Sequence, residues 1–393
     1  MDFRGLRKRS QAARARQVSA ADTARIPPRR LGNALLDDHR AIVRLTIMSR
    51  RRWLMVLLSF VATTGITAYF LRIGFSQPGP HPRLPLWAHA AALIAVLLEI
   101  GTRSVKIHLS AAALNIPLRF GTSLRVCLGG DFAAAITPAR SGAEPARFLV
   151  LAEDGVAPAP SILLLFTELL LETWSLMALC IVFLFVFSGE GKVLGVMTAL
   201  VAGYTILVLV GGAAAYVLAH RHARGPGPSW VNSFGLHAGR WRAVQRALRA
   251  LRTNLSALRH ARVVPMMAAF VASLAHIALR LMVLPIIGYA LDPTLSLSSL
   301  VLWPLVFLYG GAVAPAPGGG GAVEFGFQFA FRGMMTPAVL AGALLWWRFY
   351  TFYLYILLGG ISVGSTVLKA LRTQRRGRLH ERVAQLGFRR TGS

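Results

Sequence analysis

The sequence contains six apolar runs, each long enough to cross a lipid bilayer as a helix. A transmembrane helix needs about 20 mainly apolar residues, because the hydrocarbon core of a membrane is about 30 Å thick. The runs span residues 53–71, 84–102, 161–187, 193–219, 263–290 and 338–367. Only 15% of the residues are charged, against about 25% in soluble domains. The sequence therefore predicts an all-α, polytopic integral membrane protein.

Basic residues are concentrated in three segments outside these runs. The chain has 43 Lys and Arg against 15 Asp and Glu, and residues 1–52, 220–262 and 368–393 hold 14, nine and eight of the bases. Basic segments beside transmembrane helices are typical of cytoplasmic loops, whereas a nucleic-acid-binding protein carries its basic face on a folded soluble domain. We therefore expect cytoplasmic termini, no nucleic-acid partner, and contact between these segments and anionic lipids.

The charge distribution also predicts three parts. Residues 1–50 form a basic, mostly disordered cytoplasmic segment, residues 51–367 a transmembrane domain, and residues 368–393 a basic cytoplasmic tail. Within the domain, residues 240–260 repeat apolar side chains at three- and four-residue steps, which predicts an amphipathic helix on the inner leaflet or an ordinary linker helix. The Ala-, Arg- and Gly-rich composition favours a bacterial cytoplasmic (inner) membrane.

The sequence offers little support for an enzyme. It lacks the motifs of zinc proteases, serine hydrolases and kinases, and two cysteines, Cys127 and Cys180, exclude a disulfide framework or a zinc cluster built from cysteine pairs. We therefore expect no enzymatic activity, no cofactor and no metal ion. The alternative is an enzyme that acts inside the bilayer, with Asp131, Glu168 and Glu172 in acid–base roles.

Two further apolar regions, 122–152 and 297–334, are interrupted by proline, glycine and charged residues. Proline removes a backbone donor and glycine adds backbone freedom, so neither region is expected to form one continuous helix. All three basic segments fall on the same side of the membrane if each region enters and leaves on one side. The sequence therefore predicts two re-entrant or broken helical segments, of which the second could also be two short spans.

The two broken segments lie in units of opposite orientation. The first unit begins with the run 84–102 and the second with the run 263–290. Each break has a proline, a glycine four residues later and a glutamate two or three residues beyond, starting at Pro138 and Pro317. Inverted repeats with broken helices are typical of transporters, whose substrate sites lie where the breaks meet. The alternative is chance similarity between two Gly- and Pro-rich loops.

Ionisable residues inside the apolar regions are energetically costly and suggest function. Glu168 and Glu172 share one helix face, and Arg280 and Arg348 are candidate partners for them. Such residues either form buried ion pairs that fix helix register or hold a lipid phosphate, which the guanidinium group suits. The set comprises six acids and five bases: Glu99, Asp131, Arg140, Glu144, Arg147, Glu168, Glu172, Arg280, Glu324, Arg332 and Arg348.

Two details of this pattern give separate expectations. Glu99 and Arg332 lie near the ends of apolar runs, where charged side chains snorkel to the membrane surface. The four glycines at 318–321 could present backbone N–H groups to an anion, or could allow helices to pack closely.

Three motifs, TPARSGAEPARFLVL, TELLLE and PAPGGGGAVEFGF, resemble the transmembrane flippase-like domain of lysylphosphatidylglycerol synthases. The resemblance covers about residues 50–367 and implies a stand-alone member without the synthase domain. It also implies inverted repeats with re-entrant segments, and movement of a phospholipid between leaflets. Two positions depart from the family pattern. Leu169 stands where the family has an arginine, and Ala143 separates a glycine and a glutamate that are usually adjacent.

These observations predict a lipid flippase or transporter whose partners are membrane lipids. The lipid would be an anionic or aminoacylated phospholipid or a hopanoid, and the protein could form a homo-oligomer. The alternative is a non-transporting membrane partner of a lipid or envelope-glycan biosynthetic enzyme. The candidate substrate-binding residues are Asp131, Thr137, Pro138, Arg140, Gly142, Glu144, Arg147, Glu168, Glu172, Arg280, Pro317, Gly318, Gly319, Gly320, Gly321, Glu324 and Arg348.

Overall fold

The computed structural model describes residues 50–76, 83–137, 139–189, 191–221, 245, 261–311, 316 and 319–364. The chain divides into a unit of residues 1–54 and a unit of residues 55–393, and the second unit contains the site discussed below. Three predicted features lie outside the described residues: the basic N-terminal segment before Arg50, the amphipathic helix at 240–260 apart from Gln245, and the tail at 368–393.

Most of the described residues are helical, and none of them forms a β-strand. The predicted all-α, polytopic membrane fold is confirmed. Among the described residues, four stretches are long and apolar enough to cross a membrane, namely Pro158–Val186, Val193–Ala214, Val263–Leu291 and Pro337–Gly364. In chain order, with η marking a π-helix, the helices are α3 (Arg50–Phe75), α4 (Leu86–Ala113), α5 (Phe120–Ile136), α6 (Ala143–Glu153), α7 (Pro158–Val186), α8 (Gly191–Arg221), α11 (Val263–Leu281), α12 (Val283–Leu291), α13 (Leu297–Leu305), η1 (Val306–Gly310), α14 (Ala322–Phe331), α15 (Pro337–Arg348) and η3 (Phe349–Tyr353).

Helix α4 is longer than the sequence predicts. The sequence predicts that the run 84–102 is followed by a loop holding Arg103, Lys106 and Arg119, but α4 continues to Ala113. This prediction is wrong: Arg103 and Lys106 are 2% and 0% exposed. The helix continues because carboxylates on neighbouring helices neutralise both side chains, which removes most of the cost of burying them.

Helices α5 and α6 form the first broken segment, in which two short helices pack against each other. The Thr137 hydroxyl donates to the Ala133 carbonyl at 2.6 Å and accepts the backbone N–H of Gly142 at 2.8 Å. Ala139 and Arg140 have φ angles of 48° and 54°, in the left-handed region that a continuous α-helix excludes. The predicted interruption is confirmed here; Pro138 lies outside the described residues.

The second broken segment comprises α13, η1 and α14. The backbone of its turn packs closely against α3. A Cβ atom on Gly320 would lie only 2.1 Å from Cγ2 of Thr63. Gly321, which precedes α14, has a φ angle of 82°. Residues with a Cβ atom rarely adopt this angle. The glycines are therefore needed for close packing and for the turn. Pro317 and Gly318 lie outside the described residues.

Aromatic side chains pack this second segment onto α15. The rings of Phe307 and Phe327 lie 5.7 Å and 5.6 Å from the ring of Trp347, and Phe327 also contacts Phe331 at 4.8 Å. All four side chains are buried. Aromatic pairs at these separations contribute about 0.5–1.5 kcal/mol each beyond their buried area, so this cluster fixes one wall of the cavity described below.

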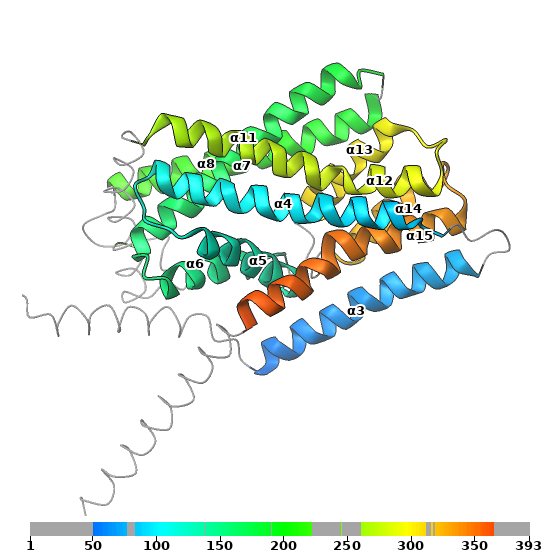
Figure 1. Cartoon of the computed structure of the whole chain (residues 1–393), viewed down its shortest axis with the longest axis horizontal. Coiled ribbons are helices and arrows are strands. Elements are labelled where there is room, and N and C mark those ends of the chain that lie inside the picture. The colour runs from blue at the N-terminus through cyan, green and yellow to red at the C-terminus, as the bar shows by residue number, and fades with distance from the viewer. Residues whose placement is uncertain are drawn as a thin grey trace, which may run out of the picture. The chain divides into compact units, whose positions relative to one another are not determined.

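The helices are arranged as two inverted units. Helices α4 and α11 lie side by side and run in opposite directions, while the α5–α6 pair and the α13–α14 pair lie toward opposite ends of these long helices (Figure 1). The inverted arrangement predicted from the order of spans and breaks is therefore present in the fold.

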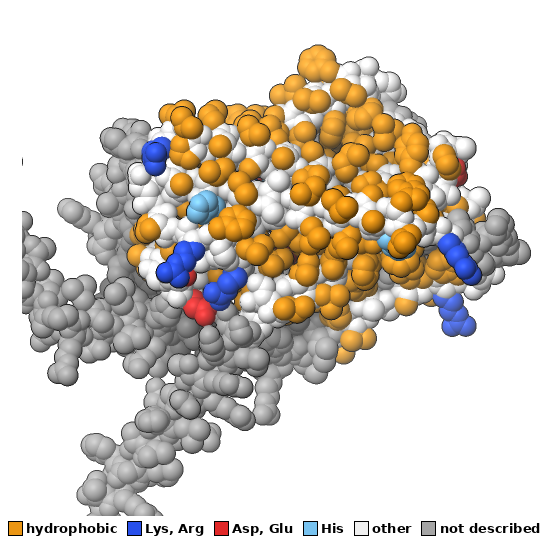
Figure 2. Space-filling view, in the orientation of Figure 1, with side chains coloured by type: hydrophobic (Ala, Val, Ile, Leu, Met, Phe, Trp, Pro, Cys, Tyr) orange, Lys and Arg blue, Asp and Glu red, His pale blue; other side chains and the backbone are white. Residues whose placement is uncertain are grey.

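The outer surface of the bundle is apolar. Hydrophobic side chains cover most of the described face in Figure 2, over α4, α11 and α12. On these helices, Ile94 and Leu98 of α4 and Val264 and Val271 of α11 are more than half exposed. Contiguous apolar surface of this extent is unfavourable in water and suits lipid chains.

Replacing Gly359 with alanine is expected to lower the free energy of unfolding by about 1–3 kcal/mol, the usual cost of overpacking a well-packed interior. A Cβ atom at Gly359 would lie 2.5 Å from the Leu128 carbonyl oxygen and 2.6 Å from Cβ of Phe132. Gly364→Ala is the matched control, because nothing lies within 4 Å of its Cβ position. Unfolding in mixed detergent micelles measures both variants, and equal stability would contradict the close contact between α5 and the helix that follows η3.

Candidate functional site

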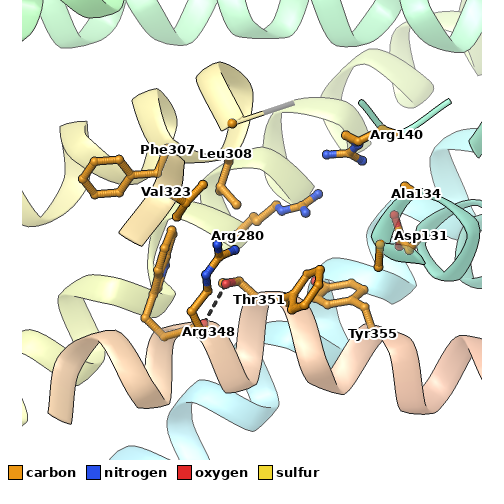
Figure 3. Close-up of a pocket in the computed structure, with 14 residues that line it drawn as sticks. Asp131, Ala134, Arg140, Arg280, Phe307, Leu308, Val323, Arg348, Thr351 and Tyr355 are labelled. Atoms are coloured by element: carbon orange, nitrogen blue, oxygen red, sulfur yellow. Dashed lines mark hydrogen bonds between the residues drawn. The ribbon is translucent and has the colours of Figure 1, made fainter. Parts of the chain in front are cut away.

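The two broken segments meet at one cavity. It is lined by Asp131 and Arg140 from the first segment and by Phe307, Leu308 and Val323 from the second (Figure 3). Arg280 of α11 and the stretch from Trp347 to Tyr355 complete its wall. The cavity volume is about 60 Å³, enough for a few water molecules. The two breaks therefore meet at one cavity, whose wall combines four charged side chains with apolar and aromatic ones.

One carboxylate joins the second broken segment to two neighbouring helices. Oε1 of Glu324 accepts from Nε of Arg348 on α15 at 2.8 Å and from the hydroxyl of Thr67 on α3 at 2.9 Å. Its other oxygen accepts the backbone N–H of Gly321 at 2.7 Å. Glu324 is fully buried. Because the Gly321 N–H is already used by Glu324, this N–H is not available to an anion in this conformation.

A second group of buried charges connects α4 with α5 and α11. The guanidinium of Arg103 binds both carboxylate oxygens of Asp131, with the Nη1–Oδ1 distance at 3.0 Å. Glu99, one turn before Arg103, lies 3.6 Å from its Nε and 4.0 Å from Nη1 of Arg280, and accepts the Tyr355 hydroxyl at 2.7 Å. The bidentate geometry of Arg103 and Asp131 is the strong form of such a pair.

A third group lies around the two glutamates of α7. Nζ of Lys106 is 3.4 Å from a carboxylate oxygen of both Glu168 and Glu172. The other oxygen of Glu168 lies 3.3 Å from Arg147, and the other oxygen of Glu172 accepts the Tyr309 hydroxyl at 3.3 Å. Lys106 thus relieves the repulsion between two like charges that are one helical turn apart.

Two arginines in the cavity wall are poorly neutralised. The side chains of Arg140 and Arg280 extend toward the same space from opposite sides (Figure 3). The acidic partner of Arg280 is Glu99, whose Oε1 lies 4.0 Å from Nη1 of Arg280. The same oxygen lies closer to Arg103, 3.6 Å from its Nε. No carboxylate of the described part of the chain lies within salt-bridge distance of Arg140. The cavity therefore presents guanidinium groups with unused capacity for an anion.

The structure revises several sequence predictions about these charges. Arg280 and Arg348 are not the partners of Glu168 and Glu172, because they lie near Glu99 and Glu324 instead. Glu99 does not snorkel: it is fully buried, because α4 continues well beyond it. Arg332 is exposed just after α14, and its snorkelling stays a prediction.

The described site residues fall into three regions. Asp131, Arg140, Arg280 and Arg348 line the cavity. Thr137, Gly142, Glu144, Arg147, Glu168 and Glu172 belong to the first break or to the α7 charge group beside it. Gly319, Gly320, Gly321 and Glu324 belong to the second break. Whether any of them contacts a lipid stays a prediction.

Several residues of the network escaped the sequence analysis. Arg103 and Lys106 were placed outside the membrane, and the hydroxyls of Thr67, Tyr309 and Tyr355 were not considered. One sequence signal was present for α4: Glu99, Arg103 and Lys106 are spaced by four and three residues, so they share one face of a helix. The tyrosines and the threonine carry no such signal, because their partners are distant in sequence.

Comparison with known proteins supports the membrane assignment and a lipid-related role. The sequence matches the family described as "Lysylphosphatidylglycerol synthase TM region" over residues 53–359. None of the curated proteins compared with the chain matches it significantly. The family match spans more than half of the chain and both broken segments, so this protein belongs to the family of the lysylphosphatidylglycerol synthase transmembrane region.

Proposed function

We propose that the protein moves a polar-headed lipid between the two leaflets of a bacterial inner membrane, without enzymatic modification of that lipid. The headgroup passes through the cavity between the two broken segments while the acyl chains stay in the surrounding bilayer. The basic segments, and with them both termini, lie on the cytoplasmic side. This assignment follows from their positions beside the membrane helices.

One observation carries this proposal: two helical interruptions from inverted units meet at a cavity whose wall contains Arg140 and Arg280. Inverted units with paired breaks provide two related gates around a single site. Non-helical backbone is tolerated at membrane depth where it is buried in protein or lines an aqueous cavity. Membership of a family named for a lipid synthase adds a lipid-related context.

The test is leaflet exchange of fluorescent lipids in liposomes that contain the purified protein. Lipids with a fluorophore on an acyl chain keep their natural headgroup, and a membrane-impermeant reductant bleaches only those in the outer leaflet. The wild-type protein is expected to accelerate exchange over protein-free liposomes. Arg140→Gln and Arg280→Gln are each expected to slow exchange by about 10-fold or more, since a hydrogen bond to a charged group contributes about 1.5–3 kcal/mol.

Arg125→Gln is the matched control. Arg125 also lies on the first broken segment, but it is about one-third exposed and pairs with Glu153 at 2.5 Å, away from the cavity. The Arg125→Gln variant should therefore exchange lipids at the wild-type rate. Equal slowing of all three variants would indicate a general loss of folding rather than loss of a binding site.

The small cavity favours a second candidate, a non-transporting membrane partner of a lipid-synthesising enzyme. A volume of about 60 Å³ does not admit a phospholipid headgroup without a change of conformation. A scaffold would need no such change. If Arg140→Gln restores the lipid composition of a deletion strain as well as the wild type does, and neither protein accelerates leaflet exchange, the scaffold is the better assignment.

A further inference from the structure

We infer that the cavity recognises the phosphate of a lipid whose headgroup carries one net negative charge and no amine. This inference rests on the proposed function and names the class of lipid for that same site. The chemical feature recognised is a monoanionic phosphodiester. Headgroups with an ammonium, whether zwitterionic or cationic, are excluded.

The first argument is the charge of the cavity wall. Four arginines form the wall or bind its carboxylates: Arg103, Arg140, Arg280 and Arg348. Three carboxylates neutralise them, namely Asp131, Glu99 and Glu324. One formal positive charge is left over. Buried unpaired charge is costly, so an anion of one charge is the ligand that this environment stabilises best.

The second argument is the position of the surplus charge. The arginines that share it, Arg140 and Arg280, are the two whose side chains meet in the open part of the cavity (Figure 3). A guanidinium presents a planar fork of donors that matches two oxygens of a phosphate. Two guanidiniums facing one space can therefore hold one phosphodiester between them.

The third argument is that the carboxylates of Asp131 and Glu324 are already occupied. Both oxygens of Asp131 are bound by Arg103, and those of Glu324 by Arg348, Thr67 and Gly321. In the neighbouring α7 group, Lys106 and Arg147 bind Glu168. An ammonium group that entered the cavity would meet the guanidiniums of Arg140 and Arg280. Oε1 of Glu99 accepts no hydrogen bond from the described residues, but it lies behind the lining residues, 3.6 Å from Arg103 and 4.0 Å from Arg280.

The neighbouring α7 group does not reverse this conclusion. It contains three carboxylates, Glu144, Glu168 and Glu172, and two bases, Lys106 and Arg147, so it carries one surplus negative charge. The Glu144 side chain is 63% exposed at the surface, whereas Arg147 is 11% exposed. The surplus acid therefore lies outside the cavity, and the surplus base lies within it.

The experiment compares three lipids in the same liposomes. Acyl-labelled phosphatidylglycerol is a monoanion, phosphatidylethanolamine is a zwitterion, and lysyl-phosphatidylglycerol carries a net positive charge. We expect exchange of phosphatidylglycerol to be at least about 10-fold faster than exchange of either amine-bearing lipid. Arg280→Gln should remove most of this preference. Lysyl-phosphatidylglycerol that moves as fast as phosphatidylglycerol, or faster, would overturn the inference.

A binding measurement separates this inference from the proposed function. Short-chain forms of the three lipids are titrated calorimetrically into the full-length protein in detergent, with Arg125→Gln as the control. Preferential binding of the monoanion without leaflet exchange would refute transport and support the recognition. Equal binding of all three lipids would refute the recognition. Inorganic phosphate and glycerol phosphate are titrated in parallel, and binding as tight as that of the lipid would identify a soluble anion as the ligand.

Discussion

Replacement of Glu324 with glutamine is expected to lower the free energy of unfolding by about 3–5 kcal/mol, the usual cost of removing one partner of a buried ion pair. Glu324 is fully buried, and its carboxylate neutralises Arg348 at 2.8 Å. It also holds Thr67 of α3 and the backbone of Gly321. The loss thus affects three elements at once. Denaturant titration in mixed micelles measures the change.

The double variant Glu324→Gln with Arg348→Gln provides the internal control. Removing both charges avoids a buried guanidinium whose neutralising carboxylate is gone, so the double variant should be more stable than the sum of the single changes by about 0.5–3 kcal/mol. Thr67→Val removes only a neutral donor and should cost about 1 kcal/mol. Strict additivity in the double variant would mean that the pair at 2.8 Å contributes nothing to the fold.

Lys106→Met is expected to cause a loss of similar size, about 3–5 kcal/mol. Methionine preserves the length and packing of the lysine stem but removes the ammonium group that lies 3.4 Å from both Glu168 and Glu172. Arg147 still neutralises Glu168, whereas Glu172 keeps only the Tyr309 hydroxyl among its described contacts. The melting temperature of the detergent-solubilised protein reports the effect.

Two comparisons make the Lys106 result interpretable. Arg125→Met removes a basic group of similar length from a surface pair, which should cost at most about 1 kcal/mol. Adding Glu172→Gln to Lys106→Met removes the unpaired acid and should restore part of the lost stability. If Lys106→Met were as stable as Arg125→Met, the ion pairs of α7 would not hold this part of the bundle together.

Much of the fold could be predicted because its signals are local. Apolar runs of about 20 residues identified α7, α8, the α11–α12 stretch and α15, and proline with glycine identified the two interruptions. Helix α4 was cut short because a charged residue usually ends an apolar run. Its actual end depends on Asp131, Glu168 and Glu172, which lie on other helices and neutralise its bases.

The ion pairs themselves could not be predicted, since they depend on how helices distant in sequence pack. Counting charges gave six acids and five bases, and the structure replaces the exposed Arg332 by Arg103 and Lys106, so the network has six of each. The balance was thus visible in the sequence, but the pairing was not. Arg348 is an example. The sequence analysis paired it with Glu168 or Glu172 of α7, because nothing in the sequence distinguishes these acids from Glu324. In the structure, the turn before α14 places Glu324 beside Arg348.

The two π-helices, η1 at Val306–Gly310 and η3 at Phe349–Tyr353, border the cavity on adjacent walls. A π-turn contains about one residue more than an α-turn, so each of these two helices has an extra residue at the cavity wall. Tightening such a turn passes the extra residue along the helix and rotates the side chains behind it by about 100°, the angle between successive residues. Such a rotation would reposition Phe307 and Tyr355 in the cavity wall and change the width of the cavity while the helices that carry them stay folded.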